Sequence, residues 1–185
     1  GGADNIVIGD LSGTDLSRLE ISLIGGSGQA NDGVADNVTQ NGTQGADTIA
    51  ISSANKQITV SGLNTQTQIT GADAALDRLA INGQGGDDVI DASALAAGVI
   101  GLTMNGGLGA DIFLGSAGND LMIGGDGDDI ALMGAGDDTF VWNPGDDNDT
   151  LEGQAGTDTM LFNGANVAEN IDISANGGRV RFFRD

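Results

Sequence analysis

Four aspartates recur at nine-residue intervals in the middle of the chain, at Asp111, Asp120, Asp129 and Asp138, and a glycine stands two residues before each. Carboxylates at a fixed spacing can collect cations. The chain has neither Cys nor His, which excludes thiolate chemistry and ordinary zinc, copper and haem sites. Only oxygen ligands remain, and Ca²⁺, which accepts roughly six to eight oxygens in a flexible geometry, fits them better than Mg²⁺.

The charge balance points to the same cation. The 185 residues include 24 Asp and 3 Glu against 5 Arg and 1 Lys, a net charge of -21. Between Leu79 and Gly178 there are 15 Asp and 2 Glu but no Lys or Arg. No internal ion pair can neutralise this segment, so it either stays unfolded or folds around bound cations. Because hydrophobic residues make up only 39% of the chain and aromatic residues 3%, we expect a thin core that needs this additional support.

The aspartates belong to a repeat of nine residues with the form G-G-x-G-x-D-x-U-x, where U is a large apolar residue. Four contiguous copies are GGLGADIFL (106–114), GSAGNDLMI (115–123), GGDGDDIAL (124–132) and MGAGDDTFV (133–141). Three more are GQAGTDTML (153–161), NGQGGDDVI (82–90) with Asp87 in register, and GTQGADTIA (42–50) with Asp47 in register.

Each part of the repeat has a physical role. The glycine-rich first six residues favour a turn, and the last three favour a short strand whose apolar residue points inward. Two repeats complete a coil of eighteen residues, and coils stack about 4.8 Å apart. Asp111 should therefore lie over Asp129, and Asp120 over Asp138. Stacked carboxylates repel one another, and a shared Ca²⁺ would convert that repulsion into a crosslink.

These motifs resemble the RTX, or haemolysin-type, calcium-binding β-roll family of secreted bacterial proteins. The resemblance implies an all-β fold, a right-handed parallel β-roll or β-solenoid with Ca²⁺ bound in stacked Gly/Asp-rich turns. It implies carboxylate ligands at Asp87, Asp111, Asp120, Asp129, Asp138, Asp149 and Asp158. It also implies ligands from the turn backbone at Asn82, Gln84, Gly106, Gly107, Leu108, Gly109, Gly115, Ala117, Gly124, Gly125, Asp126, Gly127, Met133, Gly134, Ala135, Gly136, Gln154 and Gly156.

Two places depart from the nonapeptide spacing. Asp87 and Asp111 are 24 residues apart, so we expect residues 91–98 to form a wider turn without calcium that keeps the two stacked. In the eleven-residue unit from Trp142 to Glu152, either Asp147 or Asp149 could be the ligand. We favour Asp149, because Leu151 then takes the apolar position. The off-register acids, including Asp88, Asp128, Asp137 and Asp146, are expected to be solvated or to lie outside the ligand shell.

We expect three regions in one continuous solenoid: wider irregular coils at 1–81, the nonapeptide roll at 82–163 and a C-terminal hairpin or cap at 164–185. Clusters of β-branched residues predict strands at Asn5–Ile8, Leu19–Leu23, Thr48–Ile51, Gln57–Val60 and Arg78–Ile81. The tail predicts two strands joined at Asn176–Gly177.

Other interpretations remain open. The aspartates could be turn formers in a metal-free solenoid, although turns alone do not require a strict spacing of nine. An adjacent pair such as Asp128 and Asp129 could serve a glycosidase, but consecutive strand residues point to opposite faces. An EF-hand at 126–137 is excluded, because no Glu closes the loop.

The function expected from the sequence is a non-enzymatic, calcium-binding structural module of a secreted or cell-surface bacterial protein of the adhesin, surface-layer or filament type, folding on Ca²⁺ binding. The alternative is an accessory module of a secreted enzyme or toxin, such as a protease or polysaccharide epimerase. A self-contained carbohydrate-active β-helix is disfavoured by the missing His and Tyr. Expected partners are calcium ions and copies of the chain or neighbouring repeat units. Nucleic acid is not expected, because the chain lacks a basic footprint, and membrane insertion is not expected, because no apolar run is long enough.

Overall fold

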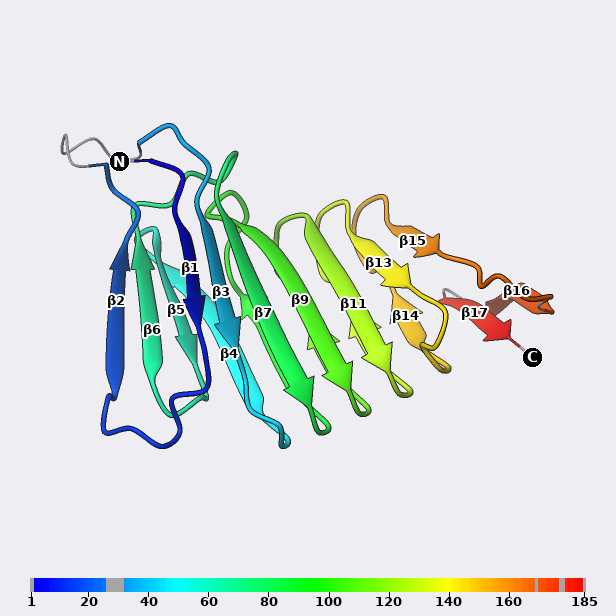
Figure 1. The fold of residues 1–185 in the computed structure, drawn as a ribbon. Helices are drawn as coiled ribbons and strands as arrows, with labels where there is room; N and C mark the ends of the chain where they lie inside the picture. The colour runs from blue at the N-terminus through cyan, green and yellow to red at the C-terminus, as the bar shows by residue number, and fades with distance from the viewer. Residues whose placement is uncertain (1, 26–31, 169, 177–178, 185) are drawn as a thin grey trace.

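The computed structural model describes residues 2–25, 32–168, 170–176 and 179–184, and it contains only strands, turns and loops. Two sheets face each other, and the chain passes repeatedly from one to the other (Figure 1). Sheet A contains, in spatial order, β1 (Asn5–Ile8), β3 (Asn37–Asn41), β7 (Arg78–Gly85), β9 (Gly101–Leu108), β11 (Asp120–Asp126), β13 (Thr139–Trp142) and β15 (Thr159–Phe162).

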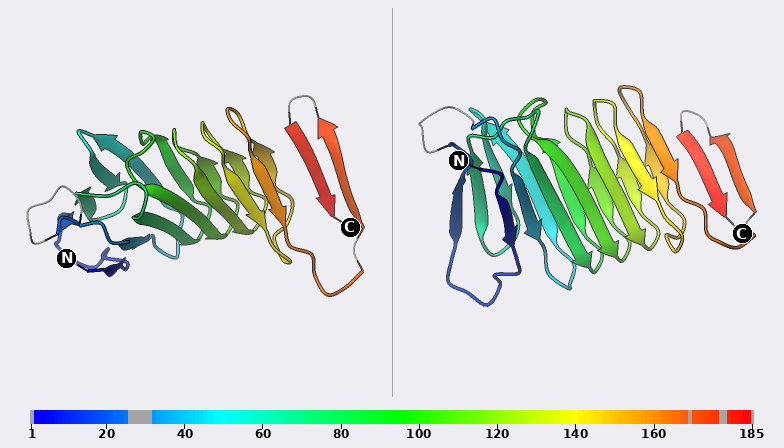
Figure 2. Two further views of the ribbon diagram at one scale, coloured as in Figure 1. Left: turned by 90° about the horizontal axis from the view of Figure 1, so that it is seen from above. Right: turned by 45° about the horizontal axis from the view of Figure 1, so that its top comes forward.

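Sheet B contains ten strands. In spatial order they are β16 (Ile171–Asn176), β17 (Arg179–Arg184), β14 (Thr150–Glu152), β12 (Ile130–Leu132), β10 (Ile112–Leu114), β8 (Val89–Ala94), β4 (Thr48–Ala54), β5 (Gln57–Ser61), β6 (Gln66–Thr70) and β2 (Arg18–Ser22). Figure 2 shows the two sheets as the walls of a long, flat roll, with the hairpin of β16 and β17 at one end. The expected all-β roll with parallel sheets is confirmed.

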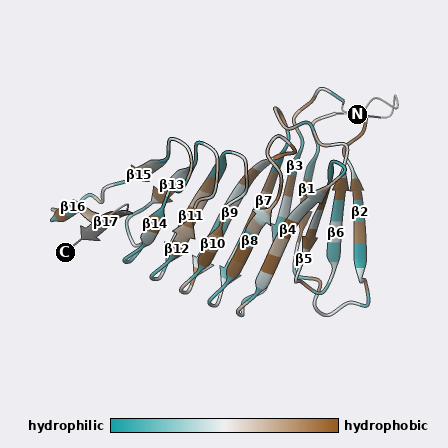
Figure 3. Cartoon of the chain, turned by 180° about the vertical axis from the view of Figure 1, so that it is seen from behind, coloured by the Kyte–Doolittle hydropathy of each residue, from teal (hydrophilic) through white to brown (hydrophobic). Residues whose placement is uncertain are grey.

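The register of the roll follows the repeat length. Ile112 pairs with Ile130 in sheet B and Leu121 pairs with Thr139 in sheet A, so one coil is eighteen residues long in both sheets. Alternate residues of each strand point into the narrow space between the sheets. Phe113, Met122 and Phe140 are fully buried there. Seen from behind, strands β4, β8 and β10 carry much of the hydrophobic colour, and the strand ends and turns are more hydrophilic (Figure 3).

Strands of sheet A are longer than three residues. β9 and β11 continue through the first residues of the next motif, and Gly107 pairs with Gly125 within the sheet. Sheet B keeps the expected three-residue strands in β10, β12 and β14. The difference arises because the first turn residues of alternate repeats extend the parallel ladder of sheet A.

The N-terminal coils are less regular than the roll. The expected strands are present, but β5 and β6 form an antiparallel hairpin inserted between β4 and β2. This adds two strands to sheet B that have no counterpart in sheet A. At the other end, β16 and β17 pair antiparallel, as the tail sequence predicts, while their turn at 177–178 lies outside the described residues. In the described part of the chain, no helix is long and apolar enough to cross a membrane.

Candidate metal-binding turns

A column of aspartates follows each of the two edges where the chain turns between the sheets. The first edge carries Asp47, Asp88, Asp111, Asp129 and Asp149. Along it the backbone N–H of each aspartate donates to Oδ1 of the aspartate in the next coil, at 2.7, 2.7, 2.8 and 3.0 Å in chain order. Oδ1 therefore has a structural duty, because it holds the register between neighbouring coils.

The second edge shows the same relationship. Asp120 N–H donates to Asp138 Oδ1 at 2.8 Å, and Asp138 N–H donates to Asp158 Oδ1 at 3.2 Å. The structure thus stacks Asp111 with Asp129 and Asp120 with Asp138. A second, separate run on this edge joins Asp4 and Asp36, and then Asp36 and Asp77, at 2.8 Å each. This run is not predicted by the sequence pattern, because no nonapeptide surrounds it.

The other carboxylate oxygen folds back over the first glycine of its own turn. A β-carbon at Gly106 would clash with Asp111 Oδ2 and would lie 2.7 Å from the carbonyl oxygen of Gly124, in the next coil. Gly83 is placed in the same way beneath Asp88 and next to the Gly106 carbonyl. Gly83 and Gly106 must be glycine because a carboxylate oxygen and a carbonyl oxygen converge on the space that a side chain would fill.

Glycines at the second and fourth positions have another role. Gly107 and Gly125 have φ of 110° and 106°, in the left-handed region that favours glycine. A β-carbon on Gly125 would clash with the carbonyl oxygen of Gly107 in the preceding coil. Successive turns therefore stack with their backbones in close approach, and carbonyl oxygens are brought next to the aspartate column.

Several oxygens that converge on one point and accept no hydrogen bond are suitable ligands for a hard cation such as Ca²⁺. Oδ2 is buried and has no hydrogen-bond partner in Asp88, Asp111, Asp129, Asp138 and Asp149. Leaving one buried acceptor unsatisfied costs about 1–3 kcal/mol, and more for a charged group. Among the described residues, no three carboxylates gather at one point. A cation here would be held by two stacked aspartates at most, with the other ligands from the backbone carbonyls of the turns. The residues fit Ca²⁺ in this way.

Burial raises the pKa of these carboxyls. The pKa of Asp111 is raised to about 6, that of Asp149 to about 7 and that of Asp129 to about 8. Loss of hydration is the main cause, opposed by the backbone N–H bond to Oδ1 and reinforced by neighbouring carboxylates. The pKa values of Asp88 and Asp138 are raised for the same main reason. Without a cation, these acids resist ionising together.

The register predicted for Asp87 is wrong by one residue. Ile112 pairs with Val89, so the residue in register with Asp111 is Asp88, which is fully buried. Asp87 is exposed, and its Oδ1 accepts the N–H of Ala110. The reason is the inward position two residues after the register acid, which the fully buried Ile90 fills. Asn82, consequently, is not the first turn residue, because it pairs with Asn105 and not with Gly106; its Nδ2 donates to Asn41 Oδ1 at 2.8 Å.

The eleven-residue unit places Asp149 in register, since Asp129 N–H donates to its Oδ1, while Asp147 is exposed. Asp120 differs from the other register acids. Both of its oxygens accept hydrogen bonds from Ser116, Oδ2 from the backbone N–H at 2.6 Å and Oδ1 from the hydroxyl at 2.8 Å. Burial raises its pKa to about 6. Asp158 closes the second column and is only half-buried.

The residues just before the register acids form an outer ladder of hydrogen bonds that the sequence pattern does not predict. Oδ1 of Asp128 accepts the N–H of Asn148 at 3.1 Å, and Oδ1 of Asp137 accepts the N–H of Thr157 at 2.9 Å. Exposed acids at this position therefore join successive coils rather than being merely solvated. The signal in the sequence was the recurrence of Asp-Asp pairs at the register position.

The remaining turn residues lie where the motif places them. Met133 and Ala135 face Gly115 and Ser116 of the preceding coil, since Ala135 N–H donates to Ser116 O at 3.1 Å. Gln154 has φ of 69°, and its Oε1 accepts the N–H of Gly134 at 3.0 Å. The backbones of the other turn residues assigned from the motif line the same two edges, which leaves their roles as ligands a prediction.

Comparison with known protein families agrees with this geometry. Four copies of the RTX calcium-binding nonapeptide repeat match the chain, at residues 80–94, 105–140 and 145–166. No curated protein matches the chain. RTX nonapeptide repeats bind Ca²⁺, and the matched residues include the five register acids whose Oδ2 atoms have no donor. The segment from 80 to 166 therefore belongs to the RTX calcium-binding nonapeptide repeat family, and it forms a calcium-binding β-roll.

Proposed function

We propose that this chain is a structural module of a secreted or cell-surface bacterial protein, of the adhesin, surface-layer or filament type, and that its roll folds on binding Ca²⁺. The observation that carries the proposal is the row of buried Oδ2 atoms with no donor along the two turn edges. Binding energy at sites absent from the unfolded chain becomes folding energy.

The charge distribution supports export before folding. With no Lys or Arg between Leu79 and Gly178, the roll lacks internal cations and depends on those in its surroundings. Calcium is scarce in the cytosol and abundant outside cells, so such a chain would remain unfolded until it is exported. The carboxylates of the roll have ligand duties along the columns, and this favours a structural role over acid–base catalysis.

The experiment is a Ca²⁺ titration of the chelated protein followed by far-ultraviolet circular dichroism, with calorimetry to count bound ions. We expect a cooperative gain of β signal with Ca²⁺. Mg²⁺ at equal ionic strength is the control, and it should give little change, because it prefers fewer protein ligands. A spectrum that is the same in chelator and in calcium would refute the proposal, as would an equal response to Mg²⁺.

A further inference from the structure

The aspartate column continues beyond the matched repeats into the N-terminal coils. Asp47 N–H donates to Asp88 Oδ1 at 2.7 Å, as in the roll, and Gly42 lies beneath Asp47 Oδ2 as Gly106 lies beneath Asp111. By position, the turn at 42–47 and the turn at 83–88 form one more step of the same ladder. Its hydrogen bonds, however, are different.

Two glutamine side chains occupy this step. Gln84 Nε2 donates to the carbonyl oxygen of Gly42 at 3.1 Å, and Gln44 Nε2 donates to Gln84 Oε1 at 2.6 Å. Asp47 Oδ2 accepts the N–H of Thr43 at 2.6 Å. The first-position carbonyl and the carboxylate, both of which would face a cation, already have donors. The side-chain N–H groups of Gln44 and Gln84 therefore supply partial positive charge at the place where the roll would bind a cation.

Gln84 keeps this position against its backbone preference. Its φ is 82°, whereas the equivalent residues Gly107 and Gly125 are glycines. A non-glycine residue in this region is strained. The contact of its amide with Gly42 gives the side chain a use that glycine cannot supply.

The rest of the N-terminal region also satisfies its buried carboxylate oxygens with hydrogen-bond donors from the protein. We call the described residues from 2 to 85, containing β1 to β7, the platform. Asp77 Oδ1 accepts the N–H of Asp36, and its Oδ2 accepts the N–H of Asp73 at 2.7 Å. Among the described residues, the five buried side-chain oxygens without a donor belong to Asp88 or later residues. Arg18, Lys56 and Arg78 give the platform cations of its own.

The platform also has the larger aliphatic core. Eleven of its residues are buried aliphatics: Ile8, Ile21, Leu23, Val38, Ile49, Ile51, Ile58, Val60, Ile69, Leu79 and Ile81. From residue 86 onward, the described residues include twelve buried hydrophobic residues, and only four of these are Ile or Leu: Ile90, Leu95, Ile100 and Leu102. Burial of apolar surface needs no metal, so it stabilises the platform in any calcium concentration.

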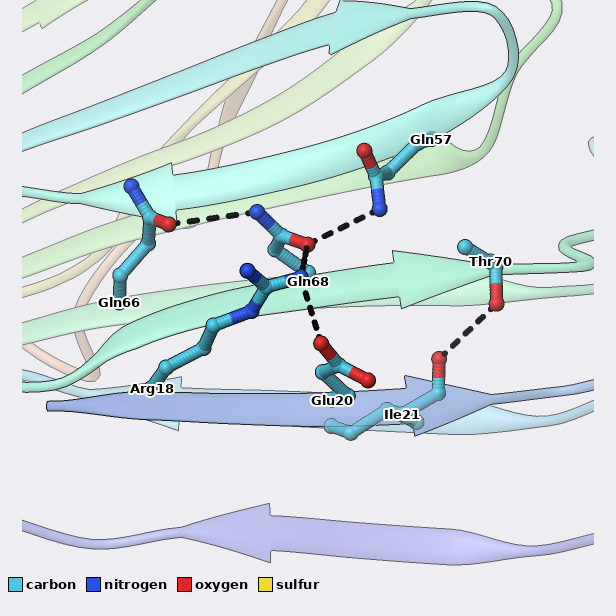
Figure 4. A network of polar contacts seen from close by, with 7 residues as sticks. All are labelled: Arg18, Glu20, Ile21, Gln57, Gln66, Gln68 and Thr70. Atoms are coloured by element: carbon cyan, nitrogen blue, oxygen red, sulfur yellow. Dashed lines mark hydrogen bonds and ion pairs between the residues drawn. The ribbon is translucent and has the colours of Figure 1, made fainter. Parts of the chain in front are cut away.

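Polar side chains join the added strands of the platform on its outer face. Gln68 of β6 accepts hydrogen bonds from Arg18 of β2 at 2.6 Å and from Gln57 of β5 at 3.0 Å (Figure 4). Arg18 also pairs with Glu20 at 2.5 Å. This network connects three neighbouring strands through side chains alone, with no need for a metal ion.

We propose that the platform folds without calcium, and that the Gln44–Gln84 amide pair marks the boundary at which the calcium-dependent roll begins. This inference rests on the proposed calcium-dependent folding of the roll. In low calcium the chain would have a folded N-terminal half and an unfolded roll. β7 would then present a preformed parallel edge on which β9 and the later coils assemble.

Hydrogen exchange followed by mass spectrometry on the full chain tests this in chelator and in calcium. In chelator, peptides from β3 to β7 should stay protected, changing less than about threefold on addition of calcium. Peptides from β10 to β13 should exchange as unfolded chain and gain at least about 100-fold protection with calcium. If both regions exchange freely in chelator, the platform inference fails while calcium-dependent folding stands. If both stay protected, calcium-dependent folding itself fails.

An isosteric pair of variants tests the amides. Gln84→Glu removes the donor to Gly42 and should lower the protection of peptides around residues 42–50 in chelator by about tenfold. Gln154→Glu makes the same charge change but keeps its acceptor for Gly134 N–H, so the platform should exchange as in the parent chain. Equal platform protection in the two variants would overturn the role assigned to Gln84.

Discussion

The backbone N–H of Asp111 donates to Oδ1 of Asp129 at 2.8 Å, while Oδ2 of both carboxylates is buried without a donor. The two oxygens of one side chain therefore have separate duties. Oδ1 fixes the stacking of coils and is satisfied in the protein alone, whereas Oδ2 is satisfied only by a proton or a cation. This division is consistent with the proposed folding of the roll on calcium, since the protein alone satisfies Oδ1 but not Oδ2.

Asp129→Asn should separate the two duties. Asn keeps an oxygen for the N–H of Asp111 and replaces Oδ2 by a donor, so repulsion between oxygens falls. We expect the chelated roll to become more stable and the calcium midpoint to rise by about tenfold or more, equivalent to roughly 1.4 kcal/mol, because two adjacent steps of the column lose a ligand. Circular dichroism titrations measure both. Asp126→Asn, at an exposed side chain in the same turn, is the control, and equal midpoints for the two variants would contradict the assignment.

The corrected register makes a sharp comparison between neighbours. Asp88→Asn should weaken the calcium response, because Asp88 is buried with a free Oδ2. Asp87→Asn should leave the calcium midpoint within about twofold of the parent, since its Oδ1 bond to Ala110 can be kept. Calorimetric titration of both variants checks this. A larger loss in Asp87→Asn would restore the register predicted from the sequence.

Gly106→Ala tests the space between carboxylate and carbonyl. A β-carbon there would clash with Asp111 Oδ2, so we expect it to displace the ligand oxygen and lower both calcium affinity and the stability of the calcium-bound form by about 1–3 kcal/mol. Gly118→Ala, whose β-carbon would meet Ala97 at 3.5 Å and Ser116 Oγ at 3.7 Å, both ordinary contacts, should fold nearly as the parent does. Thermal unfolding in excess calcium measures the difference. Similar losses of stability in both variants would count against a special role for the space at Gly106.

Much of this arrangement follows from the nine-residue repeat, which can be recognised in the sequence. The spacing of nine gave the stacking of Asp111 on Asp129, because an integral coil length fixes the register. The same reasoning failed at Asp87, where the spacing is irregular and two adjacent aspartates compete for one position. There the decisive property is which apolar neighbour can be buried, and Ile90 rather than Val89 fills the core. The hydrogen bonds of Gln84 and Ser116 were also unpredictable, because they depend on the backbone conformation of a single turn residue.

The raised pKa values predict opposite effects of pH with and without calcium. In the chelated roll, Asp111, Asp129 and Asp149 have pKa values of about 6, 8 and 7, above the ordinary value of 3.8. The folded state then binds more protons than the unfolded state between about pH 4 and 8, so its stability should fall as pH rises through this window. In calcium, protons compete with the metal, and affinity should rise with pH instead. Far-ultraviolet circular dichroism of the chelated chain and calcium titrations, each at pH 5 and pH 8, measure the two trends; a chelated chain with more β signal at pH 8 than at pH 5 would be contrary to expectation.

Trp142 should report on the last turn of the first column. Its indole Nε1 donates to the carbonyl oxygen of Asp147 at 3.2 Å, and its ring stacks on Phe162 with centroids 4.9 Å apart. It is the only tryptophan in the chain. Because it is fully buried in the folded roll, calcium should shift its emission to shorter wavelength.

Two variants of that turn show whether the signal follows the register acid. Asp149→Asn removes an orphan Oδ2, so the emission shift should need about tenfold more calcium. Asp147→Asn changes only an exposed side chain and leaves the carbonyl that Trp142 contacts, so its titration should overlay that of the parent. The indole contacts Asp147, the predicted non-ligand. A shift in the calcium titration that followed Asp147 instead of Asp149 would assign the ligand to Asp147 and move the eleven-residue turn out of the column.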